Sequence, residues 1–290
     1  MLDQAGLKPR HRFGQCFLFD QNLMQKVIGF AEIDPEQTVL EVGPGTGSLT
    51  EELLDHAARV VAVEIDHGLA RVLRKRLGER ESFQLLEQDV LAGKHEIAPE
   101  VLTAIGDDAQ MVANLPYNIA TPLIAQSLTL SWQAAVAGRQ CPRITRMTVM
   151  IQREMADRLL TGPGTRDYGP VSVLTNLLGN AVPGPLAPAS AFWPRPKVES
   201  QVVRIDFVPE KAAKVLDVQV LQQALSLAFG QRRKQIGTVA KRRGAAFSRE
   251  LFTEALSEAD ISPTQRAEQV SPEQFRRLGN ALARTAREST

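Results

Sequence analysis

The sequence predicts an α/β fold in which helices cover a parallel sheet, followed by a small helical domain. Three observations predict it. Short apolar runs alternate with helical patterns over the first two thirds of the chain, a glycine-rich turn follows the first run, and the patterns become entirely helical after about residue 209. Such alternation is typical of parallel sheets, because their strands are joined by crossovers long enough to hold a helix. We therefore expect domains at 1–208 and 209–290.

The strands of this sheet are expected where β-branched and other apolar residues gather. Five such runs lie in the first domain: 38–43, 59–64, 83–89, 110–114 and 146–152. The intervening segments "GSLTEELLDHA" and "DHGLARVLRKRL" carry apolar residues at helical spacing with polar outer faces. Ligands of such sheets bind at the carboxyl ends of the strands, so functional residues are expected there.

Proline shapes the end of the first domain and the start of the last helix. The segment 182–200 is dense in proline and cannot be helical, so we expect an ordered loop that leads into the strand "QVVRIDF". Ser271 is a good N-cap, and Pro272 suits a first helical position, where the missing N–H costs nothing. A helix is therefore predicted to begin at Pro272.

Composition excludes several classes of protein. The chain has 290 residues and only two cysteines, Cys16 and Cys141, which argues against a disulfide framework and suits a reducing compartment. The four histidines are not at ligand spacing, so no metal site is expected. No apolar run is long enough to span a bilayer and no signal-peptide core is present, so we expect a cytoplasmic protein.

Charge is unevenly distributed along the chain. The net charge is +1, yet residues 209–290 hold 14 Lys and Arg against 9 Asp and Glu, a net of +5, which leaves −4 for the first 208 residues. A basic C-terminal part hints at a polyanionic partner.

A glycine-rich loop follows the first predicted strand in "LEVGPGTGSLT". Gly43, Gly45 and Gly47 allow a sharp turn and a close approach of the backbone to a ligand. Glu64 ends the second predicted strand, where a carboxylate can accept hydrogen bonds from both hydroxyls of a ribose. Asp89 ends the third, where it can bond an adenine amino group or serve only as a loop acid.

The spacing of this loop bears on the cofactor. Dinucleotide-binding loops usually read G-x-G-x-x-G, whereas this loop reads G-x-G-x-G and follows the acidic Glu41. A carboxylate is a poor neighbour for a pyrophosphate but suits a cation. We therefore favour S-adenosylmethionine, with its sulfonium and ammonium groups, over NAD; a purely structural role of the glycines is the remaining alternative.

The segment "NLPYNIATP" follows the fourth predicted strand and so lies at the same rim. The side-chain oxygen of Asn114 and the backbone oxygen of Leu115 can fix the N–H bonds of an adenine amine out of the ring plane, which frees its lone pair for attack on a methyl group. Pro116 stiffens the turn without adding an N–H, and Tyr117 offers a face for stacking, worth ~1–3 kcal/mol per base. A plain turn explains only the asparagine and the proline.

Two further segments are candidates for RNA contact. Phe192 and Trp193 lie in the proline-rich segment, where they could close over the base opposite Tyr117 or simply anchor the loop to the core. The run "GQRRKQIGTVAKRR" contains Arg232, Arg233 and Lys234 and no acid; it could neutralise phosphates or form an ordinary solvated surface.

These motifs together resemble a known family. "RFGQCFLFD", "LEVGPGTGSLT", "VVAVEID", "EQDV", "NLPYNIATP", "AFWPRPKVES" and "FGQRRKQI" follow one another as in the bacterial 16S ribosomal RNA adenine N6-dimethyltransferases, the KsgA/RsmA family. The resemblance implies a Rossmann-like class I methyltransferase sheet with a small C-terminal helical domain. It also implies dimethylation of two adjacent adenosines in the 3′-terminal hairpin of 16S rRNA, with a role in small-subunit biogenesis.

The resemblance also implies contacts with S-adenosylmethionine. These would come from Leu18, Gly43, Glu64, Asp89 and Asn114, and from the backbone at Cys16, where the family usually has Asn or His. Thr238 departs from an asparagine that the family commonly shows.

Other functions fit the same motifs. One is methylation of a large-subunit rRNA adenine by a resistance-type relative, and another is a non-enzymatic RNA-binding assembly or transcription factor. We expect the partner to be 16S rRNA in the assembling small subunit, with no membrane, no metal and a monomeric protein.

Overall fold

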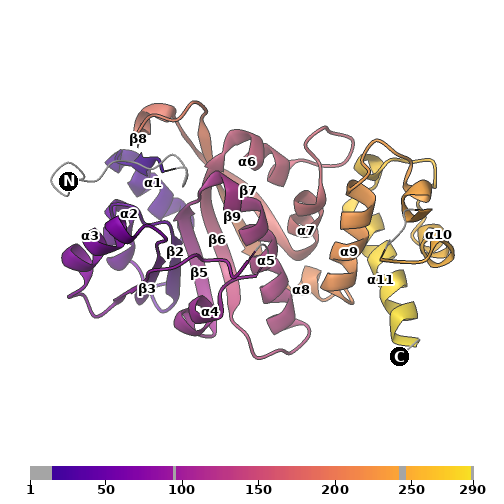
Figure 1. Cartoon of the computed structure of the whole chain (residues 1–290), viewed down its shortest axis with the longest axis horizontal. Coiled ribbons are helices and arrows are strands. Elements are labelled where there is room, and N and C mark those ends of the chain that lie inside the picture. Colours follow the sequence, from indigo (N-terminus) through magenta and orange to yellow (C-terminus); the bar gives the residue numbers. More distant parts are fainter. Residues whose placement is uncertain (1–14, 94–95, 242–245, 289–290) are drawn as a thin grey trace. The chain divides into compact units, whose positions relative to one another are not determined.

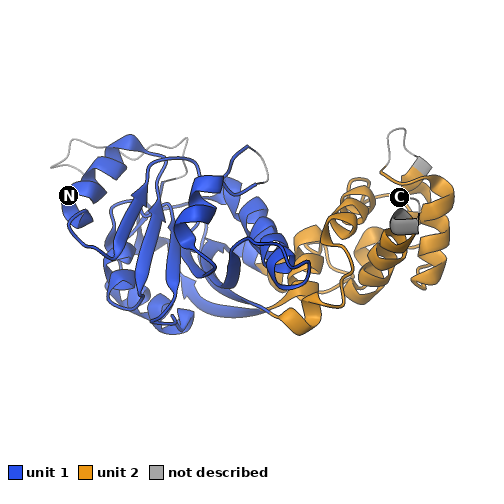
Figure 2. Ribbon diagram, turned by 90° about the horizontal axis from the view of Figure 1, so that it is seen from below, with its two compact units in different colours: residues 1–156, 181–207 blue, residues 157–180, 208–290 orange. Residues whose placement is uncertain are grey.

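The computed structural model describes residues 15–93, 96–241 and 246–288 (Figure 1). Residues 12–14 of the "RFGQCFLFD" motif, Arg242 and Arg243 of the basic run, and two of the histidines, His11 and His95, lie outside the described residues. The chain forms two compact units, the first comprising residues up to 156 with 181–207 and the second comprising 157–180 with 208–290 (Figure 2).

A seven-stranded sheet forms the centre of the first unit, in the order β4-β3-β2-β5-β6-β9-β7. The five predicted strands are present as β2 (Thr38–Val42), β3 (Arg59–Val63), β4 (Phe83–Leu86), β5 (Asp108–Asn114) and β6 (Arg143–Gln152). The third is shorter than predicted, so Asp89 lies in the loop after β4 and does not end the strand. These five pair in parallel, whereas β9 (Ser200–Phe207) pairs antiparallel to β6. Four of the five residues in β2 and in β3 are buried, which explains their continuous apolar runs.

Helices join the parallel strands, as the alternating pattern predicts. The joining helices are α2 (Ser48–Leu54), α3 (His67–Leu77), α4 (Pro99–Ile105) and α5 (Tyr117–Ala135) (Figure 1). Helix α1 (Gln21–Ala31) precedes β2, and α6 (Arg153–Leu160) follows β6. The loops that run from strands β2 and β3 into helices α2 and α3 therefore lie at one edge of the sheet, together with the turn from β5 into α5.

The proline-rich segment differs from its prediction. It is not helical, but residues 182–187 belong to strand β7 (Gly179–Ala187) instead of a loop, and η3 (Ala189–Ala191) and β8 (Phe192–Trp193) follow. β7 is an outer strand of the sheet, where the missing N–H groups of Pro183 and Pro185 cost fewer ladder hydrogen bonds than in a central strand. Local composition alone could not reveal that pairing.

A second, two-stranded sheet brings distant segments together. β1 (Phe17–Leu18) pairs antiparallel with β8, with Phe17 opposite Trp193 and Leu18 opposite Phe192. Leu18 and Phe192 are 7% and 4% exposed and belong to the core of the unit. This pairing fixes the chain just before α1.

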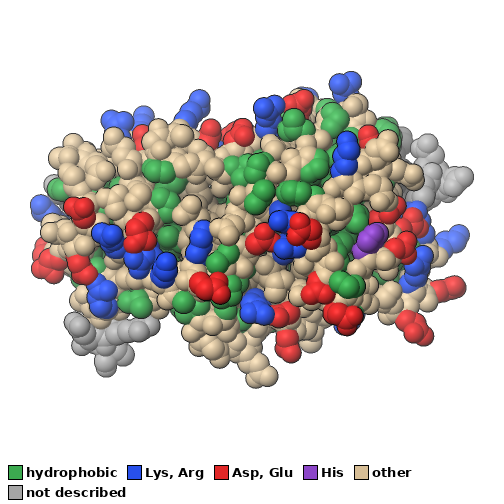
Figure 3. All heavy atoms as spheres, turned by 180° about the vertical axis from the view of Figure 1, so that it is seen from behind, with side chains coloured by type: hydrophobic (Ala, Val, Ile, Leu, Met, Phe, Trp, Pro, Cys, Tyr) green, Lys and Arg blue, Asp and Glu red, His purple; other side chains and the backbone are tan. Residues whose placement is uncertain are grey.

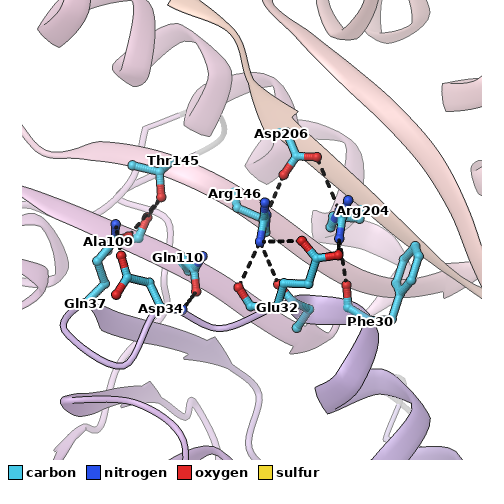
Figure 4. Close-up of polar contacts among 11 residues, drawn as sticks. Phe30, Glu32, Asp34, Gln37, Ala109, Gln110, Thr145, Arg146, Arg204 and Asp206 are labelled. Atoms are coloured by element: carbon cyan, nitrogen blue, oxygen red, sulfur yellow. Dashed lines mark hydrogen bonds and ion pairs between the residues drawn. The ribbon is translucent and has the colours of Figure 1, made fainter.

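Charged side chains hold the other end of α1 against β6 and β9 (Figure 4). The Arg146 guanidinium pairs with Asp206 and lies 3.4 Å from Glu32, and it donates to the carbonyls of Ala31 and Glu32 at 3.2 and 2.8 Å. Arg204 pairs with Glu32 at 2.7 Å and with Asp206 at 3.2 Å. The carbonyls at the end of the helix thus receive donors from the sheet.

The second unit is helical. It contains α7 (Pro170–Leu178), α8 (Pro209–Ala212), α9 (Val218–Phe229), η4 (Ile236–Lys241), α10 (Arg249–Glu258), η5 (Ala267–Gln269) and α11 (Pro272–Glu288). Tyr168 is fully buried against Phe229, and its hydroxyl donates to the carbonyl of Val270 at 2.9 Å. The predicted start of α11 is confirmed, because the Gln274 N–H donates to the Ser271 hydroxyl at 3.2 Å.

The units divide the chain near residue 208, where the sequence analysis places a boundary, and also assign 157–180 to the second unit. The roles expected of the two predicted domains stay predictions. On the face shown in Figure 3, acidic and basic side chains are interspersed, in keeping with a net charge of +1.

The contacts of Arg146 predict its contribution to stability. Arg146→Ala would remove one of the two guanidinium partners of Asp206 and the donor to two carbonyls at the end of α1, so we expect the free energy of unfolding to fall by about 2–3 kcal/mol in urea denaturation. Arg153→Ala is the matched control, because Arg153 and Glu199 form a 3.1 Å pair whose side chains are both 56% exposed. Its expected loss is below about 0.5 kcal/mol; equal losses would contradict a structural role for the Arg146 contacts.

Candidate active site

A pocket opens at the carboxyl ends of the parallel strands, where the sequence predicts function. It is lined by the glycine loop, the ends of β3, β4 and β5, and β1 with β8. Every predicted cofactor-binding and catalytic residue lines it, together with Phe192: Cys16, Leu18, Gly43, Gly45, Glu64, Asp89, Asn114, Leu115, Pro116 and Tyr117. The roles of these residues stay predictions, but their convergence on one pocket follows from the sheet.

The glycine loop needs its glycines for conformation. Gly43, Gly45 and Gly47 have φ values of +70°, +60° and +84°, which residues with a Cβ rarely adopt. A Cβ on Gly45 would also lie 2.8 Å from the ring of Phe17. The Arg76 guanidinium donates to the Thr46 carbonyl at 2.6 Å and thereby fixes the loop from α3.

Glu64 is buried at the end of β3 and is held by two backbone donors. Its Oε1 accepts from the Asp66 N–H at 2.8 Å and its Oε2 from the Gly45 N–H at 3.2 Å. Burial raises the pKa of Glu64 to about 7, although these hydrogen bonds lower it. Each oxygen keeps capacity for a second hydrogen bond, as two ribose hydroxyls would require.

Glu41 is a second buried carboxyl in this pocket, only 2% exposed. Burial raises its pKa to about 8; the Thr50 hydroxyl lowers this pKa, and the neighbouring charge of Glu64 raises it. Among the described residues, its Oε2 has no hydrogen-bond partner. A buried carboxyl group with one unpartnered oxygen suits a cationic ligand and would disfavour a pyrophosphate, so this acceptor fits S-adenosylmethionine.

Asn114 ends β5, and its side-chain amide is oriented by β1. Its Nδ2 donates to the backbone carbonyl of Cys16 at 3.0 Å, across 98 positions of sequence. Because a carbonyl only accepts, the NH₂ group must face Cys16, and the side-chain oxygen is left as the acceptor. This is the acceptor that the chemistry predicted for Asn114 requires.

The next three residues form the turn from β5 into α5. The Leu115 side chain is 2% exposed and its N–H donates to the Met150 carbonyl at 3.0 Å, so Leu115 can serve a ligand only through its carbonyl. Pro116 directly precedes α5, and Tyr117 is the first residue of that helix, 40% exposed. Burial raises the pKa of the Tyr117 phenol, while hydrogen bonds with Ser200 and Gln152 lower it.

Sequence reasoning missed several residues of this pocket. Ser200 and Gln152, at the start of β9 and the end of β6, are the side chains that lower the pKa of Tyr117, and Ser200 also lines the pocket. Gln88 lines it as well, and its buried Nε2 has no hydrogen-bond partner among the described residues. Gln88 carried a signal, since it directly precedes Asp89 after β4, whereas nothing local marked Ser200.

The predicted RNA-binding residues differ in their surroundings. Phe192 is 4% exposed and part of the core, while Trp193 is 49% exposed. Arg232 donates to Glu268 at 2.8 Å and to the Thr165 carbonyl at 3.1 Å, so it joins two parts of the second unit. Arg233 and Lys234 are exposed.

The described residues contain neither a candidate metal centre nor a candidate membrane span. No group of three or more His, Cys, Asp or Glu in this part of the chain could hold a metal ion. No described helix is both long enough and apolar enough to cross a bilayer.

The fold and pocket define a class I methyltransferase. A mostly parallel seven-stranded sheet carries a glycine loop after its first strand, a buried glutamate after the next and an Asn-Leu-Pro-Tyr turn at the same edge. Its cofactor is S-adenosylmethionine, as the loop spacing and Glu41 predicted.

Comparison with known proteins identifies the family. The model of the ribosomal RNA adenine dimethylase family matches residues 6–284, so the chain belongs to this family. It is 36% identical over 285 residues to "Ribosomal RNA small subunit methyltransferase A" of Geobacillus sp. (strain WCH70). The aligned region covers 97% of this chain and 94% of that protein. It is 37% identical to the protein of the same name from Caldanaerobacter subterraneus subsp. tengcongensis, over 95% of this chain and 98% of the other.

Solved structures agree with the fold. A dimethyladenosine transferase from Plasmodium falciparum superposes with a TM-score of 0.70 over 90% of this chain and 95% of that one, at 22% identity. The 23S rRNA methyltransferase ErmE superposes with a TM-score of 0.60 over 92% and 99%, at 26% identity. The predictions of an α/β methyltransferase fold and of an S-adenosylmethionine-dependent rRNA adenine dimethyltransferase are confirmed.

The two buried carboxyls predict how stability depends on pH. Their pKa values of about 7 and 8 lie above the ordinary 4.5, so the folded protein without cofactor binds more protons than the unfolded chain between these limits. The stability they contribute is full below about pH 4.5 and is lost as the pH rises towards 8.

We therefore expect Glu41→Gln, measured without cofactor by urea denaturation, to lose less unfolding free energy than the wild type between pH 5 and 8, by on the order of 2 kcal/mol. Glu100→Gln, on the exposed surface of α4, is the control and should follow the wild type. Identical pH profiles for all three proteins would show that Glu41 is not the group responsible.

Proposed function

We propose that this protein dimethylates N6 of two adjacent adenosines in the 3′-terminal hairpin of 16S rRNA, during assembly of the small ribosomal subunit. The observation that carries the adenine chemistry is the oriented Asn114 amide at the rim of the pocket. The choice of the small subunit is supported by relatives that are about 35% identical over nearly the whole chain and are named ribosomal RNA small subunit methyltransferase A.

In this proposal the pocket holds S-adenosylmethionine by its two ends. Glu64 accepts hydrogen bonds from the ribose hydroxyls, and Asp89 accepts a hydrogen bond from the adenine amino group of the cofactor. Leu18 and the backbone of Cys16, Gly43 and Gly45 close around it. Glu41, buried beside the glycine loop, balances the positive charge of the cofactor.

The substrate adenine enters between Asn114 and Tyr117. When bound, the cofactor supplies an electrophilic methyl carbon on a sulfonium. In the first transfer, the Asn114 oxygen and the Leu115 carbonyl hold the two N6 hydrogens, so that the nitrogen lone pair leaves conjugation and points at that carbon. In the second transfer, one of these acceptors holds the single hydrogen that remains. The same acceptors stabilise the positive charge that develops on nitrogen. After attack the nitrogen loses a proton to solvent, so no base with a tuned pKa is required.

Tyr117 and Phe192 bound the position of the flipped base. Tyr117 is 40% exposed and offers its ring for stacking, and its hydroxyl lies close enough to Ser200 and Gln152 for them to lower its pKa. Phe192, buried and rigid, can serve only as a wall of the pocket. Arg233 and Lys234 are exposed for phosphate contact, whereas Arg232 has a structural task and is the weaker candidate.

A second candidate is methylation of a large-subunit adenine. The likeness to the 23S rRNA methyltransferase ErmE, over 99% of that chain, is the observation in its favour. Its identity of 26% is lower than that of the small-subunit relatives. The two candidates share the chemistry at Asn114 and differ only in the RNA.

Mapping of the methylated bases tests the proposal. The protein is incubated with labelled S-adenosylmethionine and with small or large subunits that lack adenine dimethylation. We expect N6,N6-dimethyladenosine at two adjacent positions of the 16S hairpin and none in 23S rRNA. Methylation of 23S rRNA alone would establish the second candidate, and no transfer to either would exclude both.

Asn114→Ala tests the catalytic residue. We expect kcat to fall by about 10²–10³ or more, because the amine loses an acceptor in the transition state. The unfolding midpoint should stay close to that of the wild type, and binding of S-adenosylmethionine and RNA should largely survive, as measured by calorimetry and by filter binding. Turnover at the wild-type rate would remove Asn114 from the mechanism.

The double variant Arg233→Glu/Lys234→Glu tests the basic run. If both residues contact phosphates, RNA affinity should fall, and the slope of log association constant against log salt should become shallower by about one per lost contact. Lys214→Glu is the control, since Lys214 is an exposed lysine of the same unit outside the run. The same salt slope in both variants would show that the basic run is an ordinary solvated surface that does not contact phosphates.

A further inference from the structure

Three aromatic side chains share the outer face of the two-stranded sheet. In an antiparallel pair, directly opposed residues project to the same side, so Phe17 and Trp193 lie together. The Phe19 N–H donates to the Ala191 carbonyl at 3.1 Å and extends this ladder by one residue. Because side chains alternate along a strand, Phe19 returns to the side of Phe17.

The core does not require this outer face. Leu18 and Phe192, on the inner side, are the residues that the unit buries. Phe19 and Trp193 remain 58% and 49% exposed and are among the most exposed large apolar side chains of the described residues. Two exposed aromatic rings on one small sheet are typical of a ligand-binding surface.

The chain around Trp193 is positively charged. Residues 193–198 read "WPRPKV", with two cations and no acid, and Arg195 and Lys197 are both exposed. The next acid, Glu199, is paired with Arg153 at 3.1 Å. Exposed aromatic rings next to unneutralised cations are the combination with which proteins bind single-stranded nucleic acid: rings stack on bases, and cations meet phosphates.

We propose that Phe19 and Trp193 form a platform for the base next to the adenine in the pocket, an inference that rests on the proposed function. β1 and β8 line the pocket through Phe17, Leu18 and Phe192, so the platform continues the pocket rim. When one base is flipped out of the RNA, the neighbouring base loses a stacking partner. An aromatic ring at the pocket rim can replace that partner. When two adjacent adenosines are modified, the base on the platform belongs to whichever of the two is not in the pocket.

A cycle of protein and RNA changes tests this platform. Binding of the substrate hairpin is measured in the presence of S-adenosylhomocysteine, with intact RNA and with RNA that is abasic at the 5′ or the 3′ neighbour of the target. For the wild type, one of the two abasic changes should weaken binding about tenfold, the effect of one stacked base. For Trp193→Ala the same change should have almost no effect, because the stacking partner is already absent.

Control variants separate stacking from general damage. Trp193→Phe keeps a ring and should keep most of the sensitivity to the abasic neighbour, and Phe19→Ala should lose part of it. Val182→Ala, an exposed apolar change on β7 outside the pocket, should behave like the wild type. If Trp193→Ala and the wild type respond equally to both abasic RNAs, the platform is excluded.

The chain also carries its own optical probe. Its two tryptophans are Trp193 and Trp132, and Trp132 is buried in α5 at 6% exposure. In Trp132→Phe, fluorescence therefore reports on Trp193 alone. We expect quenching by the intact hairpin and less quenching when the stacked neighbour is abasic; unchanged fluorescence on saturation with RNA would overturn the proposal.

The outcomes also distinguish this inference from the proposed function. Methylation of the hairpin by the wild type, without coupling between Trp193 and either neighbour, would leave the function standing and remove the platform. Coupling in RNA binding without any methylation would do the reverse. A Trp193→Ala defect seen only with whole subunits, never with the hairpin, would assign this surface to a ribosomal protein and refute stacking.

Discussion

The orientation of the Asn114 amide depends on one hydrogen bond, which its nitrogen donates to the backbone carbonyl of Cys16. It joins the N-terminal segment to the end of a central strand and decides which atom of the amide the pocket receives. Without a carbonyl at that place, the amide could rotate and present a donor, which the proposed chemistry could not use. The side chain at position 16 is not part of this contact, so a cysteine can stand where relatives are expected to carry a polar residue.

The acceptor for this hydrogen bond is a backbone carbonyl, so its position depends on how firmly the segment around Cys16 is held. β1 is held on one side by β8, and α1 follows it directly, with Asp20 accepting from the Leu23 N–H at the helix start. The far end of α1 is held to the sheet by Arg146 and Arg204. The carbonyl of Cys16 is thus positioned by elements at both ends of a helix, which is how a scaffold keeps a site preorganised.

The sequence predicted the residues whose position follows from the class of sheet. Gly43, Glu64 and Asn114 each follow a parallel strand, and the carboxyl ends of such strands meet at one edge whatever the details of packing. It did not predict the pairing of β1 with β8, because these two strands lie more than a hundred residues apart in the chain. It did not predict the strand at 179–187 either, because the prolines of that segment argued against regular structure, whereas the segment lies beside β9 at the border of the sheet. The sequence also did not predict that Arg232 pairs with Glu268. A run of basic residues has the same sequence pattern whether its side chains face solvent or a carboxylate.

The two borders of the large sheet are built differently and have a common consequence. β4 closes one border with only four residues, and β7 closes the other with Pro183 and Pro185 in its course. A border strand that is short, or that lacks N–H groups at intervals, is a poor template for a strand from another molecule. The arrangement discourages sheet-to-sheet aggregation while leaving the strand ends, where chemistry occurs, unobstructed.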